Sequence, residues 1–508
     1  MASVVTSTIS RRRILRSLSA TLAAALFPPQ TLLAAPVAPN NLIDVHCHLF
    51  NATDLPARRF IKIVFLQHYP VQGSERLLDL DRKDTVDYLI DLMLFLVGAG
   101  RAPTAQHEMD VLDGVANPVQ AWADLTTAGE LAAQRTAEYL RQPPARRSNA
   151  RSLSRPNPVR AAILRAAGMS GRELDTLAHE ETTSAARLAY SSNTDIGAYL
   201  RWFTLFTLYR YSLLDRLTEI HRSQGFSPIL LAPAMIDFSR WLGEDVASPL
   251  EDQVKVMARI SRKHRNPAIH GYVAFDPLRE VYYRRHLLKR GSLDLVREAL
   301  TKYGFVGVKL YPPMGFRPSG NARGPNYPYP QLVLDDLGGK IAQDLNRALD
   351  DLYRLCLELD APILAHSADS NGAAETYADR ADPAYWLRVF AAFPKLRVCL
   401  AHFGRFSYIS KAAPAHSNLP ESSWEWTIGR HFVAQPNSQV FVDVSYLSEI
   451  FDDEKTRQHI GQTFRRFVST FDPDVHRIMF GTDWVVLPAY FIADPLTSPY
   501  SHLPKDGG

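Results

Sequence analysis

Five short stretches of the sequence end an apolar, strand-like run with a side chain that can bind a metal ion. Helix-length segments separate them. Because a closed barrel of parallel strands brings the carboxyl ends of all its strands to one rim, this pattern predicts a metal site on such a rim. The stretches are Asp44-Val-His46-Cys-His48, Gly307-Val-Lys309-Leu-Tyr311, Ile363-Leu-Ala-His366, Cys399-Leu-Ala-His402 and Phe480-Gly-Thr-Asp483.

His46 and His48 form the first of these signals. In an extended chain the side chains of residues i and i+2 point to the same face, so the two imidazoles can converge on one ion. A histidine pair alone is a weak signal, because a single histidine more often has a structural or surface role. The prediction therefore depends on the joint placement of these side chains at several strand ends.

Strands and helices alternate from about residue 225 almost to the end of the chain, as in βα units. We predict eight strands, at 42–45, 229–238, 269–275, 305–310, 362–365, 397–401, 440–444 and 477–480, and helices at 250–263, 293–303, 341–359, 384–393 and 456–471. The predicted fold is α/β, a (β/α)8 TIM-type barrel. A doubly wound open sheet is the alternative, but it does not explain why five strand ends carry metal-type ligands.

A mostly helical region, residues 51–224, interrupts this alternation after the first strand. Amphipathic patterns predict helices at 85–97, 119–141, 172–188 and 196–221. We predict a large helical insertion or cap within a barrel domain of residues 40–508. Loops at the carboxyl ends of barrel strands build the active site, so this insertion is expected to shape the substrate pocket.

The N-terminal residues 1–38 resemble a twin-arginine export signal. Arginines at 11–13 precede an apolar stretch, residues 18–27, and small residues follow. This predicts a periplasmic or exported protein, and a basic amphipathic helix or an uncleaved anchor is the alternative. Loss of the segment removes four of the 57 basic residues and none of the 53 acidic ones, leaving a neutral chain. No nucleic-acid partner and no stable membrane insertion after signal removal are therefore expected.

The composition is that of a soluble globular protein, with 46% hydrophobic and 22% charged residues. The three cysteines, Cys47, Cys356 and Cys399, are odd in number and lie inside predicted elements. We predict that they pack as small apolar side chains and form no disulfide scaffold.

The motifs together resemble the amidohydrolase superfamily. The phrases "DVHCHLFN", "GFVGVKLYPP", "ILAHSADSNG", "LAHFGRF" and "IMFGTDW" resemble its aminocarboxymuconate semialdehyde decarboxylase-like branch, the amidohydrolase-2 family. The resemblance covers about residues 40–486 apart from the insertion. It implies a divalent metal, with zinc as the expected ion, and a ligand set of His46, His48, His366, Asp483 and Lys309.

The resemblance also implies catalytic roles for two of the strand-end residues. A bound ion lowers the pKa of water, and Asp483 would be both a ligand and the base that takes the proton from that water. His402 would be a second-metal ligand or would position the substrate carbonyl. A strand-end cap is the structural alternative for Asp483.

Lys309 decides the expected number of ions. In binuclear members of the superfamily a lysine at this place is carboxylated and bridges two metals. In the decarboxylase-like branch one metal is usual, and the lysine can bind a substrate carboxylate as a point charge. A lysine whose stem only fills the barrel rim is the alternative. We expect one ion, and two only if Lys309 is carboxylated.

Weaker candidates for substrate binding follow the predicted strands. Tyr311, Arg317 and Arg405 could bind an anionic or aromatic small-molecule substrate through charge-assisted hydrogen bonds. Arg405 is as readily explained as a surface residue. Asp237 and Asp276, at the ends of the second and third strands, are expected to cap helices.

Three function classes remain open. The predicted export signal favours a hydrolase in which metal-bound hydroxide attacks an amide, ester or lactone bond. The alternative is a lyase that removes carbon dioxide from an aromatic or unsaturated acid without redox chemistry. A non-catalytic metal-binding protein is the third class, but the set of candidate ligands is complete.

The sequence after Asp483 departs from the resemblance. Family members close the barrel with a helix after the last strand, whereas Pro488, Pro495, Pro499 and Pro504 argue against a long helix here. The tail could pack as irregular structure, a neighbouring subunit of a homo-oligomer could fill the gap, or the reading frame could be truncated.

Overall fold

The computed structural model describes residues 40–65, 102–118, 205–322, 329–368, 370, 372–404, 421–446 and 454–484. The predicted export signal, the chain after Trp484 and Arg405 lie outside these residues. Most of the predicted insertion at 51–224 does so as well, including three of its four predicted helices. Only the last of the four overlaps a described helix, α12 (Arg210–Ser223).

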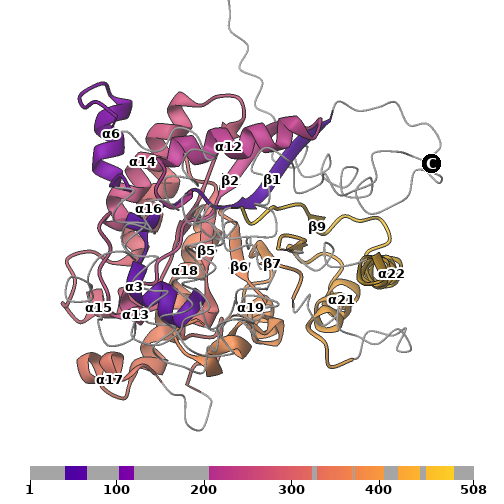
Figure 1. Ribbon diagram of the computed structural model, residues 1–508. Helices are drawn as coiled ribbons and strands as arrows, with labels where there is room; N and C mark the ends of the chain where they lie inside the picture. The colour runs from indigo at the N-terminus through magenta and orange to yellow at the C-terminus, as the bar shows by residue number, and fades with distance from the viewer. Residues whose placement is uncertain are drawn as a thin grey trace, which may run out of the picture.

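All described strands are parallel and follow one another in space in chain order. They form a three-stranded sheet and a six-stranded sheet, and β1 and β2 lie beside α12 (Figure 1). The first sheet contains β1 (Asn41–Cys47), β2 (Ser227–Pro233) and β3 (Ala268–Ile269); the second contains β4 (Tyr272–Ala274), β5 (Gly307–Leu310), β6 (Ile363–His366), β7 (Val398–Ala401), β8 (Val440–Asp443) and β9 (Ile478–Met479).

The described strands do not form the single closed sheet that the sequence predicted. The predicted third strand, 269–275, is divided into β3 and β4 at His270 and Gly271. Gly271 lies so close to β2 that a Cβ atom there would be 2.9 Å from the carbonyl oxygen of Pro233. The close approach explains why only glycine fits where the strand breaks.

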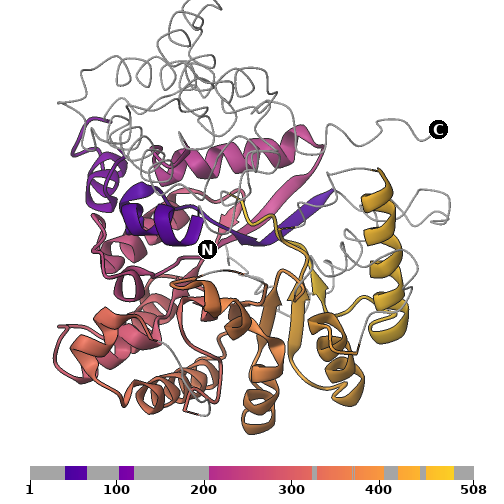
Figure 2. The ribbon, with the colours of Figure 1, turned by 60° about the horizontal axis from the view of Figure 1, so that its bottom comes forward.

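Hydrogen bonds nevertheless connect the two sheets at both junctions. At one junction Met235 N donates to Tyr272 O over 2.9 Å, next to an isolated parallel bridge from Ala234 to Tyr272. At the other, Val45 N donates to Phe480 O over 3.0 Å. The ends of β1 and β9 are therefore held side by side, as Figure 2 shows.

Except between β3 and β4, helices lie between successive strands, as predicted for βα units (Figure 2). The predicted helix 250–263 corresponds to α14 (Leu250–Lys263). The remaining described helices are α3 (Ala57–Arg59), a π-helix (Phe60–Phe65), α6 (Ala105–Leu112), α13 (Ser239–Leu242), α15 (Pro277–Arg284), α16 (Ser292–Lys302), α17 (Gln331–Leu337), α18 (Ile341–Glu358), α19 (Trp386–Ala392), α21 (Trp424–Ala434) and α22 (Glu454–Phe471), with short 3-10 turns at Ala52–Asp54, Pro312–Met314, Glu375–Ala381 and Pro383–Tyr385.

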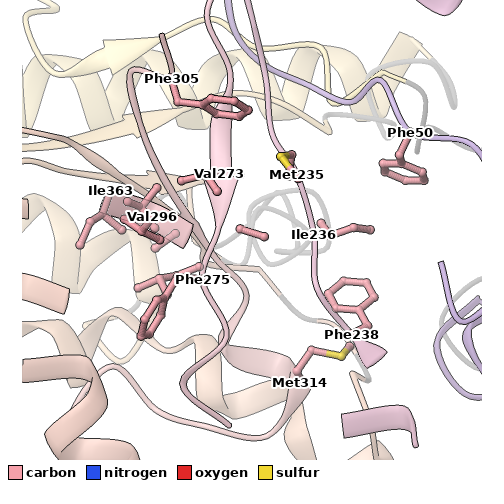
Figure 3. Packing of buried hydrophobic residues seen from close by; sticks show 14 of the residues in the cluster. Phe50, Met235, Ile236, Phe238, Val273, Phe275, Val296, Phe305, Met314 and Ile363 are labelled. Atoms are coloured by element: carbon pink, nitrogen blue, oxygen red, sulfur yellow. The ribbon is translucent and has the colours of Figure 1, made fainter. Parts of the chain in front are cut away.

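The main hydrophobic core lies between strands and helices, and Figure 3 shows part of it around Val273, Phe275 and Ile363. A second, smaller cluster is built largely from strand residues of both sheets. Its members include Ile43, Val45, Ala232, Leu364, Cys399, Ala401 and Met479. Side chains from β1, β2, β6, β7 and β9 thus pack against one another.

The three cysteines are free and buried, which confirms the prediction that no disulfide joins them. None of the helices in the described residues has the length and apolar character needed to cross a membrane.

Candidate metal centre

The predicted pair at the end of β1 meets Asp483, which follows β9. The Asp483 Oδ1 atom lies 3.0 Å from His48 Nε2 and 3.3 Å from His46 Nε2. All three side chains are buried. One donor atom from each lies within 4.8 Å of the others, so the three form a compact group of possible ligands.

The other ring nitrogen of each histidine in this group has a partner. His48 Nδ1 lies 2.7 Å from the carbonyl oxygen of Ala234, which can only accept a hydrogen bond. His46 Nδ1 lies 3.1 Å from Asp443 Oδ2 and 3.0 Å from Ser445 Oγ. A proton on each Nδ1 satisfies these contacts and leaves the Nε2 lone pair directed at Asp483.

The turn that carries Asp483 approaches β1 closely. A Cβ atom at Gly481 would lie 2.7 Å from His46 Cβ, so glycine is required there. Asp483 itself has a φ of 53° and donates its N–H to His46 O over 2.7 Å. This left-handed conformation is costly for a residue other than glycine, and such conformations cluster at functional sites.

Lys309, at the end of β5, is buried and its Nζ lies 2.8 Å from His46 Nε2. The amine therefore reaches the same nitrogen that faces Asp483. Of the sequence-predicted candidates, His46, His48, Asp483 and Lys309 are brought together directly.

His366 and His402 form a neighbouring pair. His402 Nε2 lies 3.1 Å from His366 Nδ1, and the ring of His402 lies 5.0 Å from that of His46. His366, at the end of β6, does not belong to the compact group with His48 and Asp483 among the described residues. Its Nε2 lies 3.2 Å from Ala368 O. The structure thus places His366 beside the group, connected to it through His402.

Asp443 and Ser445, after β8, are site residues that the sequence analysis missed. Asp443 forms a second compact group with His46 and His402. Its Oδ1 accepts hydrogen bonds from His402 N at 2.9 Å and Ser445 N at 3.0 Å, and it also contacts Ser445 Oγ. Asp443 lies at the end of a predicted strand, as the six recognised candidates do, and this signal could have found it. Ser445 offers no comparable signal.

The predicted substrate-binding residues are placed differently from one another. Tyr311 is packed with its ring 4.3 Å from that of His366, and its hydroxyl lies 2.8 Å from Ser370 Oγ. Arg317 lies over the ring of Tyr385, at 4.7 Å from the centroid. Only Tyr311 is therefore brought beside the clustered histidines, and Arg405 lies outside the described residues.

Of the two aspartates expected to cap helices, Asp276 does so and Asp237 does not. Asp276 caps α15 by accepting hydrogen bonds from Leu278 N and Arg279 N. Asp237 instead forms an ion pair with Arg279, with 2.5 Å between Oδ2 and Nε.

Burial and neighbouring charges set the protonation of the cluster. Burial alone would raise the pKa of Asp483, but the imidazoles of His402 and His46 outweigh it and lower that pKa well below its usual range. The same balance, with His46 as the main partner, lowers the pKa of Asp443. Burial lowers the pKa of His402 to about 4 and that of Lys309 to about 8. Ionised Asp483 and Asp443 and a neutral His402 are thus favoured near neutral pH.

This donor set fits a divalent cation. Two imidazole nitrogens and a carboxylate oxygen converge, as in catalytic zinc sites that hold three protein ligands and an open position. The other ring nitrogen, Nδ1, contacts the Asp443 carboxylate in His46 and the Ala234 carbonyl oxygen in His48. Metal-binding histidines usually make such a hydrogen bond through the nitrogen that does not bind the metal.

A small cavity adjoins the cluster at Lys309. Its lining is mostly apolar and includes two carboxyl groups. The lining residues are Met235, Ile236, Asp237, Trp241, Ala274, Phe275, Asp276, Lys309, Tyr311, Met314 and Phe316.

Comparison with known protein families adds an independent observation. The model of the family Amidohydro_2, described as amidohydrolase, matches residues 289–491. Residues 289–491 are therefore similar to the amidohydrolase-2 family. The match includes Lys309, His366, His402 and Asp483, whereas His46 and His48 lie outside it and join the site through the fold. The description of this family, amidohydrolase, names a class of enzyme, and the chain resembles it over these residues.

Several solved structures are similar to the chain at low identity. Amidohydrolase II is 11% identical, with a TM-score of 0.29 over 53% of this chain and 75% of that chain. A 5-carboxyvanillate decarboxylase from Novosphingobium aromaticivorans, with bound manganese, is 15% identical, with a TM-score of 0.31 over 64% of this chain and 86% of that chain. A Lactobacillus casei protein described as a metal-dependent hydrolase is 13% identical, with a TM-score of 0.30 over 87% of this chain and 81% of that chain.

No curated protein matches the chain.

Proposed function

We propose that this chain is an amidohydrolase-2 hydrolase that uses one divalent metal ion, with zinc as the expected metal, to cleave an amide, ester or lactone bond of a small molecule. The observation that carries the proposal is the convergence of His46, His48 and Asp483, with one donor atom from each within 4.8 Å. These residues would hold the ion, and His366 would complete the ligand set from beside them.

We also propose that the described strands belong to one closed (β/α)8 barrel in which β3 and β4 are two parts of one strand. The hydrogen bonds at both junctions between the sheets support this closure. The packing of β1 and β2 side chains against those of β6, β7 and β9 supports it as well. Closure would explain how ligands from the first and last strands reach one rim.

When bound, a divalent ion lowers the pKa of water and polarises a substrate carbonyl. Asp483 would accept the proton from the attacking water, because its carboxylate is ionised and faces both His46 and His48. Asp443 keeps His46 oriented through Nδ1. Neutral His402, beside these groups, would position the scissile group of the substrate. Tyr311 would form a wall of the pocket next to His366.

A decarboxylase is the second candidate, and the position of Lys309 favours it. A buried amine at the edge of the cavity could bind a substrate carboxylate as a point charge. Asp483 would then deliver a proton to carbon after carbon dioxide leaves, instead of accepting one from water.

Product analysis separates the two reactions. We would screen amides, esters, lactones and aromatic carboxylic acids with the metal-loaded enzyme and with a chelator-treated control. In water enriched in ¹⁸O, a hydrolase places the label in its product, whereas a decarboxylase releases carbon dioxide and leaves the label out of the remaining acid or arene. Asp483→Asn should abolish either activity, and the exposed Asp474→Asn should not. Chelator-insensitive turnover that Asp483→Asn leaves intact would overturn the proposal.

We propose in addition that residues 1–38 direct export by the twin-arginine route. The arginines at 11–13 and the apolar stretch after them support this. The double substitution Arg12→Lys with Arg13→Lys should shift the protein from the periplasmic to the cytoplasmic fraction. An unchanged distribution would contradict the proposal.

A further inference from the structure

A series of contacts runs from the Asp443 carboxylate to the carbonyl oxygen of Ala368. The groups between these two ends are Ser445, His402 and His366, and each of them can both donate and accept a hydrogen bond. The Asp443 carboxylate contacts Ser445 Oγ, and Ser445 Oγ lies 2.9 Å from His402 Nδ1. His402 Nε2 then lies 3.1 Å from His366 Nδ1. His366 Nε2 finally lies 3.2 Å from Ala368 O. The four side chains that make these contacts are all buried.

The two ends of this series can only accept hydrogen bonds. A neutral imidazole carries one proton, and so does the Ser445 hydroxyl, so the intervening groups bring three protons to four contacts. The protons can therefore point towards Asp443 or towards Ala368. Either direction fixes which nitrogen of His402 and of His366 is protonated.

The charge of Asp443 decides between the two directions. Hydrogen bonds to an ionised carboxylate are about twice as strong as those between neutral groups, whereas Ala368 offers only a neutral carbonyl. The Ser445 hydroxyl therefore donates to Asp443 and accepts from His402 Nδ1–H. The Nε2 lone pair of His402 then accepts from His366 Nδ1–H.

We propose that Ser445 is a positioning residue, which transmits the charge of Asp443 along this series of contacts and fixes both His402 and His366 as tautomers protonated on Nδ1. Ser445 lies 3.0 Å from His46 Nδ1 as well, so one hydroxyl contacts imidazoles on β1 and after β7. The consequence for metal binding rests on the proposed function: the Nε2 lone pair of His366 is the one that a cation would need.

Nitrogen NMR of the histidine side chains tests the tautomers without metal or substrate. Full-length protein labelled with ¹⁵N-histidine and freed of metal by chelation would be measured by long-range ¹H–¹⁵N correlation. His402→Gln and His366→Gln variants would assign the two rings among the 16 histidines. We expect Nδ1 protonated and Nε2 unprotonated in both rings. A wild-type spectrum with Nε2 protonated in His402 would overturn the proposal.

A second test replaces the hydroxyl of Ser445. Ser445→Ala should release both rings from the Nδ1–H tautomer and lower metal affinity by about 10- to 100-fold. Ser445→Thr retains the hydroxyl and should keep both rings in the Nδ1–H tautomer and the metal affinity at the wild-type value. Ser292→Ala removes another buried hydroxyl, one that donates to Asp276 O, and should change neither. Unchanged tautomers in Ser445→Ala would contradict the proposal. Correct tautomers in a protein that binds no metal would instead leave the proposal standing and overturn the proposed function.

Discussion

Asp44 holds Thr482 through both of its carboxylate oxygens. Its Oδ1 accepts from Thr482 N at 3.1 Å, and its Oδ2 accepts from Thr482 Oγ1 at 2.6 Å. The same Oδ1 accepts from His46 N at 3.1 Å. One carboxylate thus ties the strand that carries His46 and His48 to the turn that carries Asp483.

Thr482→Val is therefore predicted to weaken metal binding. Valine keeps the shape of threonine but lacks the hydroxyl, so the turn before Asp483 loses its contact with Asp44 Oδ2. Loss of such an outer contact is expected to lower metal affinity by about 10- to 100-fold, as measured by competition with a chromogenic chelator. The matched control is Thr463→Val in α22, whose hydroxyl donates to the carbonyl oxygen of His459 one turn earlier in the helix. Equal affinities in the two variants would show that the Asp44 contact does not position Asp483.

Lys309→Met tests the number of ions. If Lys309 is an uncarboxylated amine beside His46, the variant should still bind one divalent ion per chain, because the amine is not a ligand. Its kcat/KM for an acidic substrate should fall by about 10-fold or more, since a buried charge partner is lost. Elemental analysis of the dialysed protein gives the stoichiometry. Two ions per wild-type chain and one or none in Lys309→Met would show that a carboxylated lysine bridges two metals.

The buried cation Arg210 is predicted to be important for stability. Its guanidinium pairs with Asp54 at 2.5 Å and with Glu108 at 2.7 Å, joining segments far apart in the sequence. Arg210→Met leaves two carboxylates buried without their partner, at a cost of about 3–5 kcal/mol in the free energy of unfolding. Urea unfolding would measure the loss.

The control for Arg210 lies on the same helix. Arg222 in α12 is exposed, so Arg222→Met should change the unfolding free energy by no more than about 0.5 kcal/mol. Adding Glu108→Gln to Arg210→Met should recover part of the loss, because one unpaired charge is removed. A midpoint for Arg210→Met equal to that of Arg222→Met would contradict the assigned role.

Asp276 is predicted to make stability depend on pH. Burial, and then the negative charge of Asp237, raise the pKa of Asp276 to about 7, although Arg279 opposes the rise. An aspartate in an unfolded chain has a pKa of about 3.9. A carboxyl group whose pKa rises on folding favours the folded state at low pH, and this contribution is lost as the pH rises from about 4 to about 7.

Asp276→Asn should remove that dependence. Asparagine keeps an oxygen to accept from Trp241 Nε1 and to cap α15, but it does not ionise. The wild type is therefore expected to lose stability relative to the variant between pH 5 and pH 8, in urea unfolding at both values. The exposed Asp294→Asn in α16 serves as the control. A wild-type to variant difference that stays constant with pH would count against the raised pKa.

Regular elements were predictable where local patterns are strong. The amphipathic period of α14 and the apolar run of β6 gave boundaries within about a residue of those observed. The helix α21 was missed, because Gly429 and several aromatic residues obscure its helical pattern. The division of the third strand was missed because it depends on the approach of Gly271 to Pro233, which is a tertiary contact.

The site was predictable to the extent that each ligand ends a strand. His46, His48, Lys309 and Asp483 meet as parallel strands require. The placement of His366 against His402 was not predictable, because it depends on backbone turns such as the φ of 67° at His402. Ser445 also lies beyond sequence reasoning, since a serine after a strand is common and gains its role only from its three partners.

The central claim is that His46, His48 and Asp483 bind a divalent ion, and equilibrium dialysis of the full chain against zinc tests it most directly. We expect about one tightly bound ion per wild-type chain, loss of that ion in His48→Ala and Asp483→Asn, and its retention in the exposed Asp474→Asn. A wild-type chain that binds no ion, or an Asp483→Asn variant that binds it as tightly as the wild type, would contradict the claim.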